Sequence, residues 1–169
     1  MSNPPPPWQS DIYGILLHPG EPRLLLLPGA DGYALPHVHL NEGVWEAKVE
    51  PVAQAMQTHL GIPLVVLRYA FHQHDPQARL AEAIYVLDAR EPLPHPLLNG
   101  QWTDRETLAT LPLARPEQRA LLVAVLAEVE EGKVPPLRAP WARRGWFEEA
   151  AAWIEAQVTE RGGKLTGPI

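Results

Sequence analysis

Short apolar runs separated by turns fill the first part of the chain. Residues 11–18 and 23–27 are mostly aliphatic or aromatic, which is typical of buried strands. Proline and glycine between them, at 18–22, predict a β-hairpin. A second turn at 28–32 leads into a third predicted strand at 33–39. The chain is therefore predicted to open with three strands.

The spacing of apolar residues becomes helical after residue 50. Side chains three or four positions apart would form one apolar face: Val52, Ala55, Met56 and Leu60. Pro51 suits a first helical turn, where no backbone N–H is needed. Gly61 suits a left-handed C-terminal cap. These signals predict a helix from about Glu50 to Leu60.

Two strands and two helices are predicted next. Residues 62–71 and 81–87 are rich in β-formers and flank a turn at 74–77. Thr103 or Asp104 is predicted to cap a helix over 105–110. The helix over 116–131 opens on proline, has an apolar face and stops at Gly132.

The C-terminal part has a different composition. Residues 133–140 are a proline-rich linker, and a helix over 146–159 carries a broad aromatic stripe. Because so large an apolar face is rare on an isolated helix, we expect it to dock through Trp141–Val158. The domain itself, a second copy and a separate partner domain are three alternatives.

Together the elements predict an α+β fold, an α/β/α sandwich. We divide the chain into a disordered proline-rich lead-in at 1–10, one domain at 11–132, and a linker with a C-terminal aromatic helix at 133–169. With 46% hydrophobic residues, 169 residues suit one domain with a substantial core.

Composition excludes several classes of protein. A net charge of −6 and a pI near 5.6 argue against a general nucleic-acid or membrane surface. The chain has no cysteine, so disulfides and thiolate metal sites are excluded. It has neither a long apolar run nor a signal-peptide pattern. We therefore predict a cytoplasmic protein.

One stretch carries a recognisable motif. Leu35-Pro36, a strand, an acidic loop and a short helix follow one another up to Gly61-Ile62. This order resembles the Nudix box: Gly, five residues, Glu, seven residues, then Arg-Glu-apolar-any-Glu-Glu-any-Gly-apolar. With Gly61-Ile62 as the anchor, Glu46 matches the first glutamate and Met56 the apolar position. The resemblance implies a Nudix-like mixed sheet flanked by helices.

The remaining positions of the box hold other residue types. Gln54 occupies the position of the arginine, and Leu40 occupies the position of the opening glycine. Three carboxylates are replaced, by Ala55, Thr58 and His59. In the family these glutamates hold magnesium or manganese against a pyrophosphate, and magnesium prefers oxygen ligands. The box is therefore degenerate as a catalytic motif.

Two functional hypotheses follow. In the first, the chain is a non-catalytic module that binds a nucleotide-type small molecule, has a regulatory role or docks to a partner. No cofactor is assigned in this case. In the second, it is a metal-dependent hydrolase of a nucleoside-diphosphate-linked substrate. Glu46, Glu50 and His59 would then be catalytic, with Mg or Mn held by Glu46 and His59. Glu42 or Glu82 would be the base.

Histidines and one tryptophan are the candidate substrate-binding residues. His37 and His39 are two apart, so on a strand they share a face. His72 and His74 repeat that spacing, and two such pairs on neighbouring strands could hold zinc or nickel. The alternative is that they face solvent or substrate. Trp102 could stack on a base or pack in the core.

The last residues suggest one kind of partner. Residues 162–169 resemble the lead-in to aminoglycoside-phosphotransferase-like domains in chains where a degenerate Nudix-like module precedes one. The resemblance implies a kinase-like domain as a candidate partner, beside a homodimer through Trp141–Val158.

Overall fold

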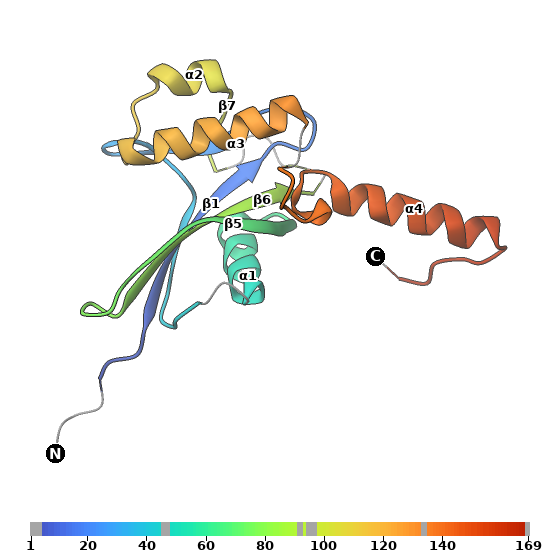
Figure 1. Ribbon diagram of the computed structural model, residues 1–169, viewed down its shortest axis with the longest axis horizontal. Helices are drawn as coiled ribbons and strands as arrows, with labels where there is room; N and C mark the ends of the chain where they lie inside the picture. Colours follow the sequence, from blue (N-terminus) through green and yellow to red (C-terminus); the bar gives the residue numbers. More distant parts are fainter. Residues whose placement is uncertain (1–4, 45–47, 91–92, 94–97, 133–134, 168–169) are drawn as a thin grey trace.

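The described strands form one mixed sheet, covered by helices on both faces. A computed structural model describes residues 5–44, 48–90, 93, 98–132 and 135–167. Helix α1 lies on one face of the sheet, while α2 and α3 lie on the other (Figure 1). The predicted α+β fold is confirmed. No helix in these ranges has the length and apolarity needed to span a membrane.

The strands and helices have the following bounds. The strands are β1 (Gln9–Leu17), β2 (Leu24–Gly29), β3 (Gly32–Ala34), β4 (His37–Leu40), β5 (Leu64–Asp75), β6 (Leu80–Ala89) and β7 (Gln101–Thr103). The helices are α1 (Val49–Leu60), α2 (Arg105–Thr110), α3 (Arg119–Glu131) and α4 (Trp146–Glu160). Short 3-10 helices cover Pro116–Gln118 and Pro140–Ala142.

Strand β1 organises the sheet. The order is β3-β2-β1-β6-β5, with β4 paired to β1 and β7 paired to β2. β1 runs parallel to β6 over its whole length and antiparallel to β4. The predicted hairpin of β1 and β2 is present, but Leu17 and Leu24 are its single aligned pair. The sheet therefore splays between β1 and β2.

Each face of the sheet buries its own core. Because side chains alternate along a strand, Ile12 and Leu16 of β1 pack toward α1, with Met56 at the centre. Ile15 of β1 packs toward α3, against residues such as Leu126. Full burial of a side chain such as Met56 contributes about 1.5–3 kcal/mol. The two cores hold α1 and α3 against opposite faces.

Helix bounds match the predicted ones closely. Asp104 caps α2 by accepting from the Thr107 N–H at 2.8 Å, which selects it over Thr103. Gly61 and Gly132 end α1 and α3 in left-handed conformations, as predicted. The helix predicted from residue 116 begins with a 3-10 turn before α3.

Two strand predictions need correction. The strand predicted at 33–39 is divided into β3 and β4, because Pro36 between them has no N–H for a ladder. The Pro36 carbonyl still accepts from Gly14 N at 2.9 Å. Strand β5 continues to Asp75, so the turn begins at residue 76 rather than at 74.

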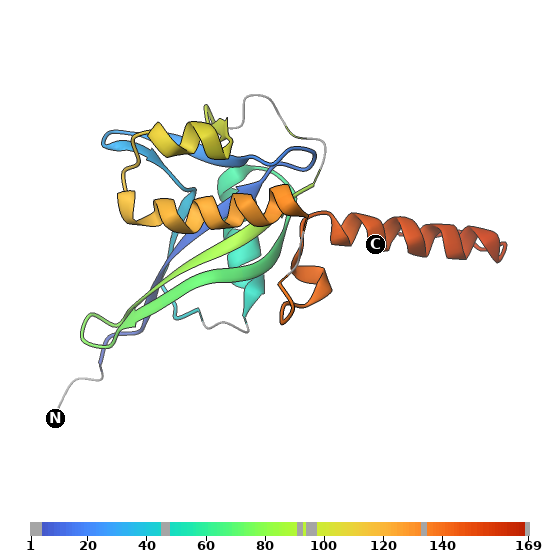
Figure 2. The same ribbon diagram turned by 45° about the horizontal axis from the view of Figure 1, so that its top comes forward.

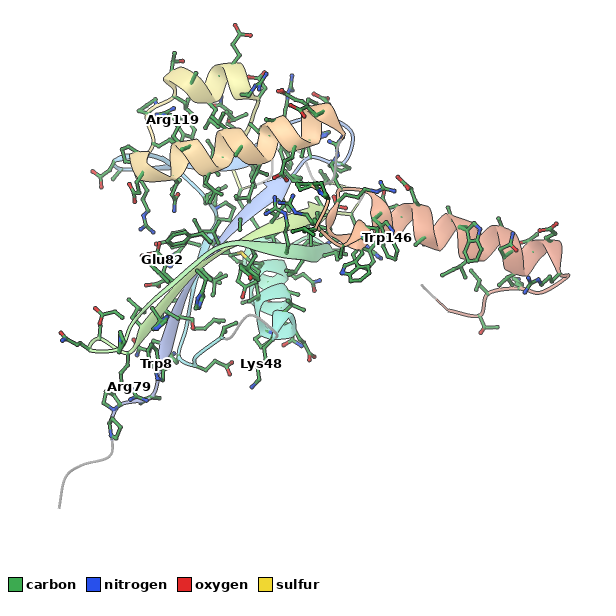
Figure 3. The ribbon with its side chains drawn as sticks, viewed as in Figure 1. Trp8, Lys48, Arg79, Glu82, Arg119 and Trp146 are labelled. Atoms are coloured by element: carbon green, nitrogen blue, oxygen red, sulfur yellow. The ribbon has the colours of Figure 1, made fainter. Side chains whose placement is uncertain are left out.

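The first strand begins inside the segment predicted as a disordered lead-in. Gln9 and Ser10 belong to β1, and Ser10 is fully buried. Ser10 Oγ donates to the Glu42 carbonyl and accepts from Val44 N–H, both at 2.9 Å. Just before the strand, the guanidinium of Arg79 lies 5.4 Å from the Trp8 ring centroid; Figure 3 shows both at the far end of the sheet.

Helix α4 projects away from the sheet in both views (Figures 1 and 2). None of its residues is buried, and Trp153 is 65% exposed. Its start is held, since Gly145 N donates to Asp88 Oδ2 at 2.7 Å and Arg144 to the His18 carbonyl at 3.0 Å. The whole helix therefore does not dock onto its own domain, which was one of the three alternatives.

Candidate functional site

Helix α1 is the helix predicted from about Glu50 to Leu60, and it carries one carboxylate, Glu50. Glu50 Oε1 accepts from Gln54 Nε2 at 3.2 Å, and Thr58 Oγ1 donates to the Gln54 carbonyl at 2.8 Å. His59 is exposed, and Ala55 is half-buried. The polar groups of Glu50 and Thr58 are thus used within the helix itself.

Glu42 does not extend helix α1. The helix begins at Val49, with Lys48 in the capping position, so Glu42 is in the preceding loop. Glu46, predicted as catalytic and metal-binding, lies outside the described residues. In the part of the chain that is described, no three His, Asp or Glu side chains are grouped so that they could hold a metal ion.

The two histidine pairs lie on opposite faces of the sheet. Val38 and Leu40 pack toward α1, so His37 and His39, which alternate with them on β4, face the α3 side. His72 is aligned with Ala83, which is part of the α1-side core. The alternative of one zinc site built from both pairs is therefore wrong.

His37 and His39 share one carboxylate. His37 Nε2 and His39 Nδ1 each lie 2.9 Å from Asp11 Oδ1. The strand register places Asp11 opposite His39, and Tyr13 opposite His37. Burial raises the pKa of Asp11, but the hydrogen bonds to the two histidines outweigh it, so the pKa is lower than usual.

Tyr13 contacts both His37 and an arginine. The Tyr13 ring stacks on His37 at 4.7 Å, and the Arg115 guanidinium lies 4.8 Å from the Tyr13 centroid. Arg115 also pairs with Glu82 at 3.1 Å and with Glu117 at 2.9 Å. Burial lowers the pKa of Arg115, yet these carboxylates raise it overall.

We call this group the sheet-face cluster: Asp11, Tyr13, His37, His39, Glu82 and Arg115. It combines half-exposed aromatic rings with cationic and anionic side chains. Glu82, a candidate base, is bound to Arg115 and lies on the α3 side (Figure 3). It therefore does not face the core packed against α1.

Trp102 lies apart from the sheet-face cluster. Its side chain packs against the α1-side core, and its ring meets that of His18 edge to face at 4.9 Å. The structure thus brings the predicted residues His37 and His39 together, but it joins neither Trp102 nor the α1 residues Glu50 and His59 to them by any contact within the described ranges.

Sequence reasoning missed Asp11, Tyr13 and Arg115. Asp11 and Tyr13 are in a predicted strand, and a polar residue in an apolar run was the one local signal. Arg115 is brought in by the segment that leads into α3, and nothing in its neighbourhood along the chain indicates this.

The lowered pKa of Asp11 predicts a pH-dependent stability. A carboxyl whose folded pKa is lowered stabilises the fold above its unfolded pKa, about 3.8, and loses this contribution as the pH falls through the folded pKa. We expect Asp11→Asn to lower the free energy of unfolding by about 1–2 kcal/mol at pH 5, and by less as the pH falls below about 3.8. Urea unfolding between pH 6 and about pH 2.5 measures this.

The control is Asp31→Asn, in the exposed turn between β2 and β3. Its difference from wild type should stay within about 0.5 kcal/mol at every pH. An Asp11→Asn difference that does not change with pH would contradict the assignment of Asp11 as the ionised partner of both histidines.

Known structures share this arrangement of strands and helices. An ADP-ribose pyrophosphatase from Streptococcus suis 89-1591 is similar with a TM-score of 0.52 and 15% identity, over 75% of this chain and 94% of that one. A Nudix hydrolase from Nitrosomonas europaea gives 0.52 and 11%, over 75% and 74%. A Sinorhizobium meliloti 1021 protein, for which oxidoreductase activity has been suggested, gives 0.54 and 12%, over 72% of this chain and 40% of that one. No protein-family model and no curated protein matches the sequence.

Proposed function

We propose that this chain, which has the Nudix fold, is a non-catalytic module that binds a nucleotide-type small molecule at the sheet-face cluster. The observation that carries the proposal is the composition of α1. At the positions where the family has metal-binding carboxylates, the helix has Ala55, Thr58 and His59.

Simple electrostatics explain why this composition matters. Two unit charges about 4 Å apart interact by roughly 4 kcal/mol at an effective dielectric constant of 20, and a divalent ion doubles the figure. Ala55 offers no ligand atom, and Thr58 offers a neutral hydroxyl. The imidazole of His59 suits zinc, copper or nickel better than magnesium. Glu50 alone would hold magnesium weakly.

The sheet-face cluster supplies what binding without hydrolysis requires. Tyr13 and His37 form a stacked aromatic surface, and aromatic rings stack on bases irrespective of sequence. Arg115 adds a cation that suits a phosphate, while Asp11 fixes both histidines. These contacts favour a ligand with a flat ring, and its phosphate would replace Glu82 or Glu117 as the partner of Arg115.

Calorimetric titration of the protein with ADP-ribose tests this function, with and without magnesium, manganese or zinc, while phosphate release is followed. We expect binding without turnover. Arg115→Gln should weaken that binding about tenfold, since a charged hydrogen bond contributes about 1.5–3 kcal/mol. Turnover that depends on metal would overturn the proposal in favour of the hydrolase with Glu46, Glu50 and His59. That hydrolase would in turn be excluded if a Glu46→Gln, His59→Ala double variant kept full turnover.

A triple replacement tests the role of the lost carboxylates. When Ala55, Thr58 and His59 are all replaced by glutamate, we expect calorimetric binding of magnesium, because three oxygen-ligand carboxylates return to one helix. The control adds three glutamates to exposed positions of α4, at Ala152, Ala156 and Thr159. If neither variant binds magnesium, loss of these carboxylates is not the whole reason for an inactive box.

Partner docking is a second candidate function, favoured by the exposure of α4. Trp141, in the short 3-10 helix before α4, is 54% exposed. Trp153 of α4 is 65% exposed, and no residue of α4 is buried. We infer that Trp141–Val158 contacts a second copy or a kinase-like domain. Sedimentation of the chain with and without residues 141–169 tests the second-copy form. A monomer in both cases would leave a different domain as the partner.

A further inference from the structure

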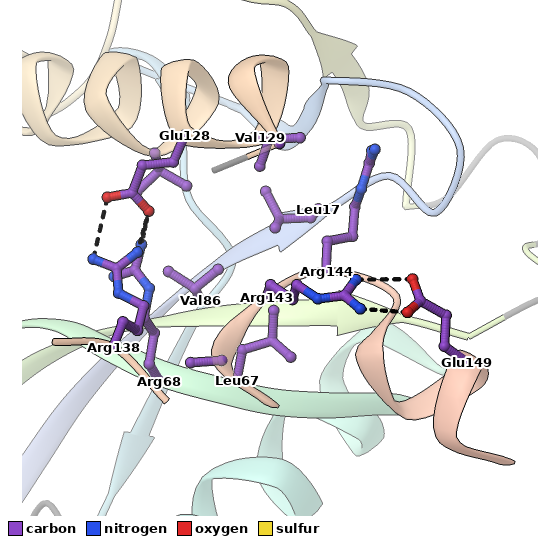
Figure 4. A pocket seen from close by; sticks show the side chains of 13 residues that line it. Leu17, Leu67, Arg68, Val86, Glu128, Val129, Arg138, Arg143, Arg144 and Glu149 are labelled. Carbon is purple, nitrogen blue, oxygen red and sulfur yellow. Dashed lines mark hydrogen bonds and ion pairs between the residues drawn. The ribbon is translucent and has the colours of Figure 1, made fainter. Parts of the chain in front are cut away.

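A cavity of about 270 Å³ lies on the α3 side of the sheet, away from the sheet-face cluster. It is bounded by α3, by strands β1, β5 and β6, and by residues 138–149 (Figure 4). Its floor is apolar and is formed by Leu17, Leu67, Val86, Val125 and Val129. A volume of roughly 150 Å³ already holds benzene in a protein interior, so this cavity has room for an aromatic ring with a substituent.

The rim of the cavity is made of charged side chains. Arg68 and Arg138 both bind the carboxylate of Glu128, at 2.9 Å from Arg68 Nη2 to Oε2 and at 3.1 Å from Arg138 Nη2 to Oε1. Arg143 pairs with Glu149 through Nη1 and Oε1 at 2.8 Å. Figure 4 shows these charged groups at the edge of the apolar floor.

Positive charge exceeds negative charge around this space. Four arginines and two glutamates line it, which gives 4 − 2 = +2. Glu128 neutralises one of its two arginines, and Arg144 is bound to the carbonyl of His18 rather than to a glutamate. Burial, and then the nearby charge of Arg138, lower the pKa of Arg68. An added anion would relieve the repulsion between these arginines.

We propose that this cavity binds a small organic anion, with an apolar body on the valine and leucine floor and a carboxylate or phosphate on Arg68 and Arg138. Arginine is suited to both groups because its planar fork donates two parallel hydrogen bonds. The mixture of an apolar floor with a few polar groups is typical of small-molecule sites.

The site is separate from the proposed nucleotide site. Arg115 precedes α3, whereas Glu128 and Val129 are near its end. The 13 residues of α3 span about 20 Å at 1.5 Å per residue. Tyr13 is near the middle of β1, and Leu17 is its last residue. A ligand in the cavity would therefore leave the sheet-face cluster free.

Calorimetry with four probes tests the inference: phenyl phosphate, benzoate, inorganic phosphate and benzyl alcohol. We expect phenyl phosphate or benzoate to bind at least tenfold more tightly than inorganic phosphate, which lacks the ring, and than benzyl alcohol, which lacks the charge. A preference between the first two distinguishes a phosphate ligand from a carboxylate ligand.

Two variants locate the binding. Arg138→Gln removes one cation and leaves Glu128 paired with Arg68, so it should weaken the aromatic anions about tenfold. Val129→Phe fills space above the apolar floor without a change of charge, and it should weaken binding of the aromatic anions by the same factor. The matched control is Arg105→Gln, which breaks the Arg105–Glu130 pair outside the lining and should leave affinity within about twofold.

Three results would overturn the proposal. Absence of binding by both aromatic anions at millimolar concentration would do so, as would unchanged affinity in folded Arg138→Gln and Val129→Phe proteins. A loss of affinity in Arg115→Gln, with Arg138→Gln unaffected, would move the binding to the sheet-face cluster. Thermal unfolding shows whether each variant is folded.

Discussion

Gly32→Ala is expected to lower the free energy of unfolding by about 2–4 kcal/mol, since strained backbone costs about 1–3 kcal/mol and a clash adds to it. Gly32 has φ of +120°, and a Cβ there would lie 2.7 Å from the Pro112 carbonyl oxygen and 3.2 Å from Ala114 N. These are backbone atoms, so they cannot rotate away. Urea unfolding measures the loss.

This contact also positions part of the proposed site. Tyr33 N donates to the Pro112 carbonyl, and Ala114 N donates to the Tyr33 carbonyl, both at 2.9 Å. Arg115 follows directly after Ala114. Displacement of this segment by Gly32→Ala should therefore weaken ADP-ribose binding as well as the fold.

Gly20→Ala is the control for this prediction. No atom lies within 4 Å of a Cβ added at Gly20, so stability should stay within about 0.5 kcal/mol. If Gly32→Ala unfolds with the same midpoint as Gly20→Ala, the close approach of β3 to Pro112 is not tight in solution.

Ser10→Ala is expected to lower the free energy of unfolding by about 2–4 kcal/mol. Its hydroxyl donates to the Glu42 carbonyl and accepts from Val44 N–H. Val44 is buried, and a buried N–H left without a partner costs about 1–3 kcal/mol; loss of the part-buried bond to the Glu42 carbonyl adds to this cost. The change would also release residues 42–44, which follow β4. Chemical denaturation, with hydrogen exchange at Val44 N–H, measures both effects.

Thr58→Ala is a matched control, because it removes a hydroxyl from an exposed position of α1 where the Oγ bond is local. Its effect should be within about 0.5 kcal/mol. A Ser10→Ala protein as stable as this control, with unchanged protection of Val44, would show that the serine does not hold residues 42–44.

The sequence by itself determined most of the local structure. Helical spacing of apolar residues located the helices, short apolar runs between turns located the strands, and caps such as Asp104, Gly61 and Gly132 indicated the helix ends. These signals are short-range, since they depend on neighbouring backbone groups. The prediction of a degenerate box, with Ala55, Thr58 and His59 at its carboxylate positions, likewise comes from the order of residues alone.

Tertiary structure alone decided which side chains meet. Asp11 reaches His37 and His39 because β1 and β4 pair in one register, and Arg115 arrives from a distant segment. The cavity exists because residues 138–149 return to β5 and α3. Composition placed Ser10 in a disordered lead-in, yet pairing of β1 buries it. Strand register and long-range packing depend on the whole core, so no local pattern contains them.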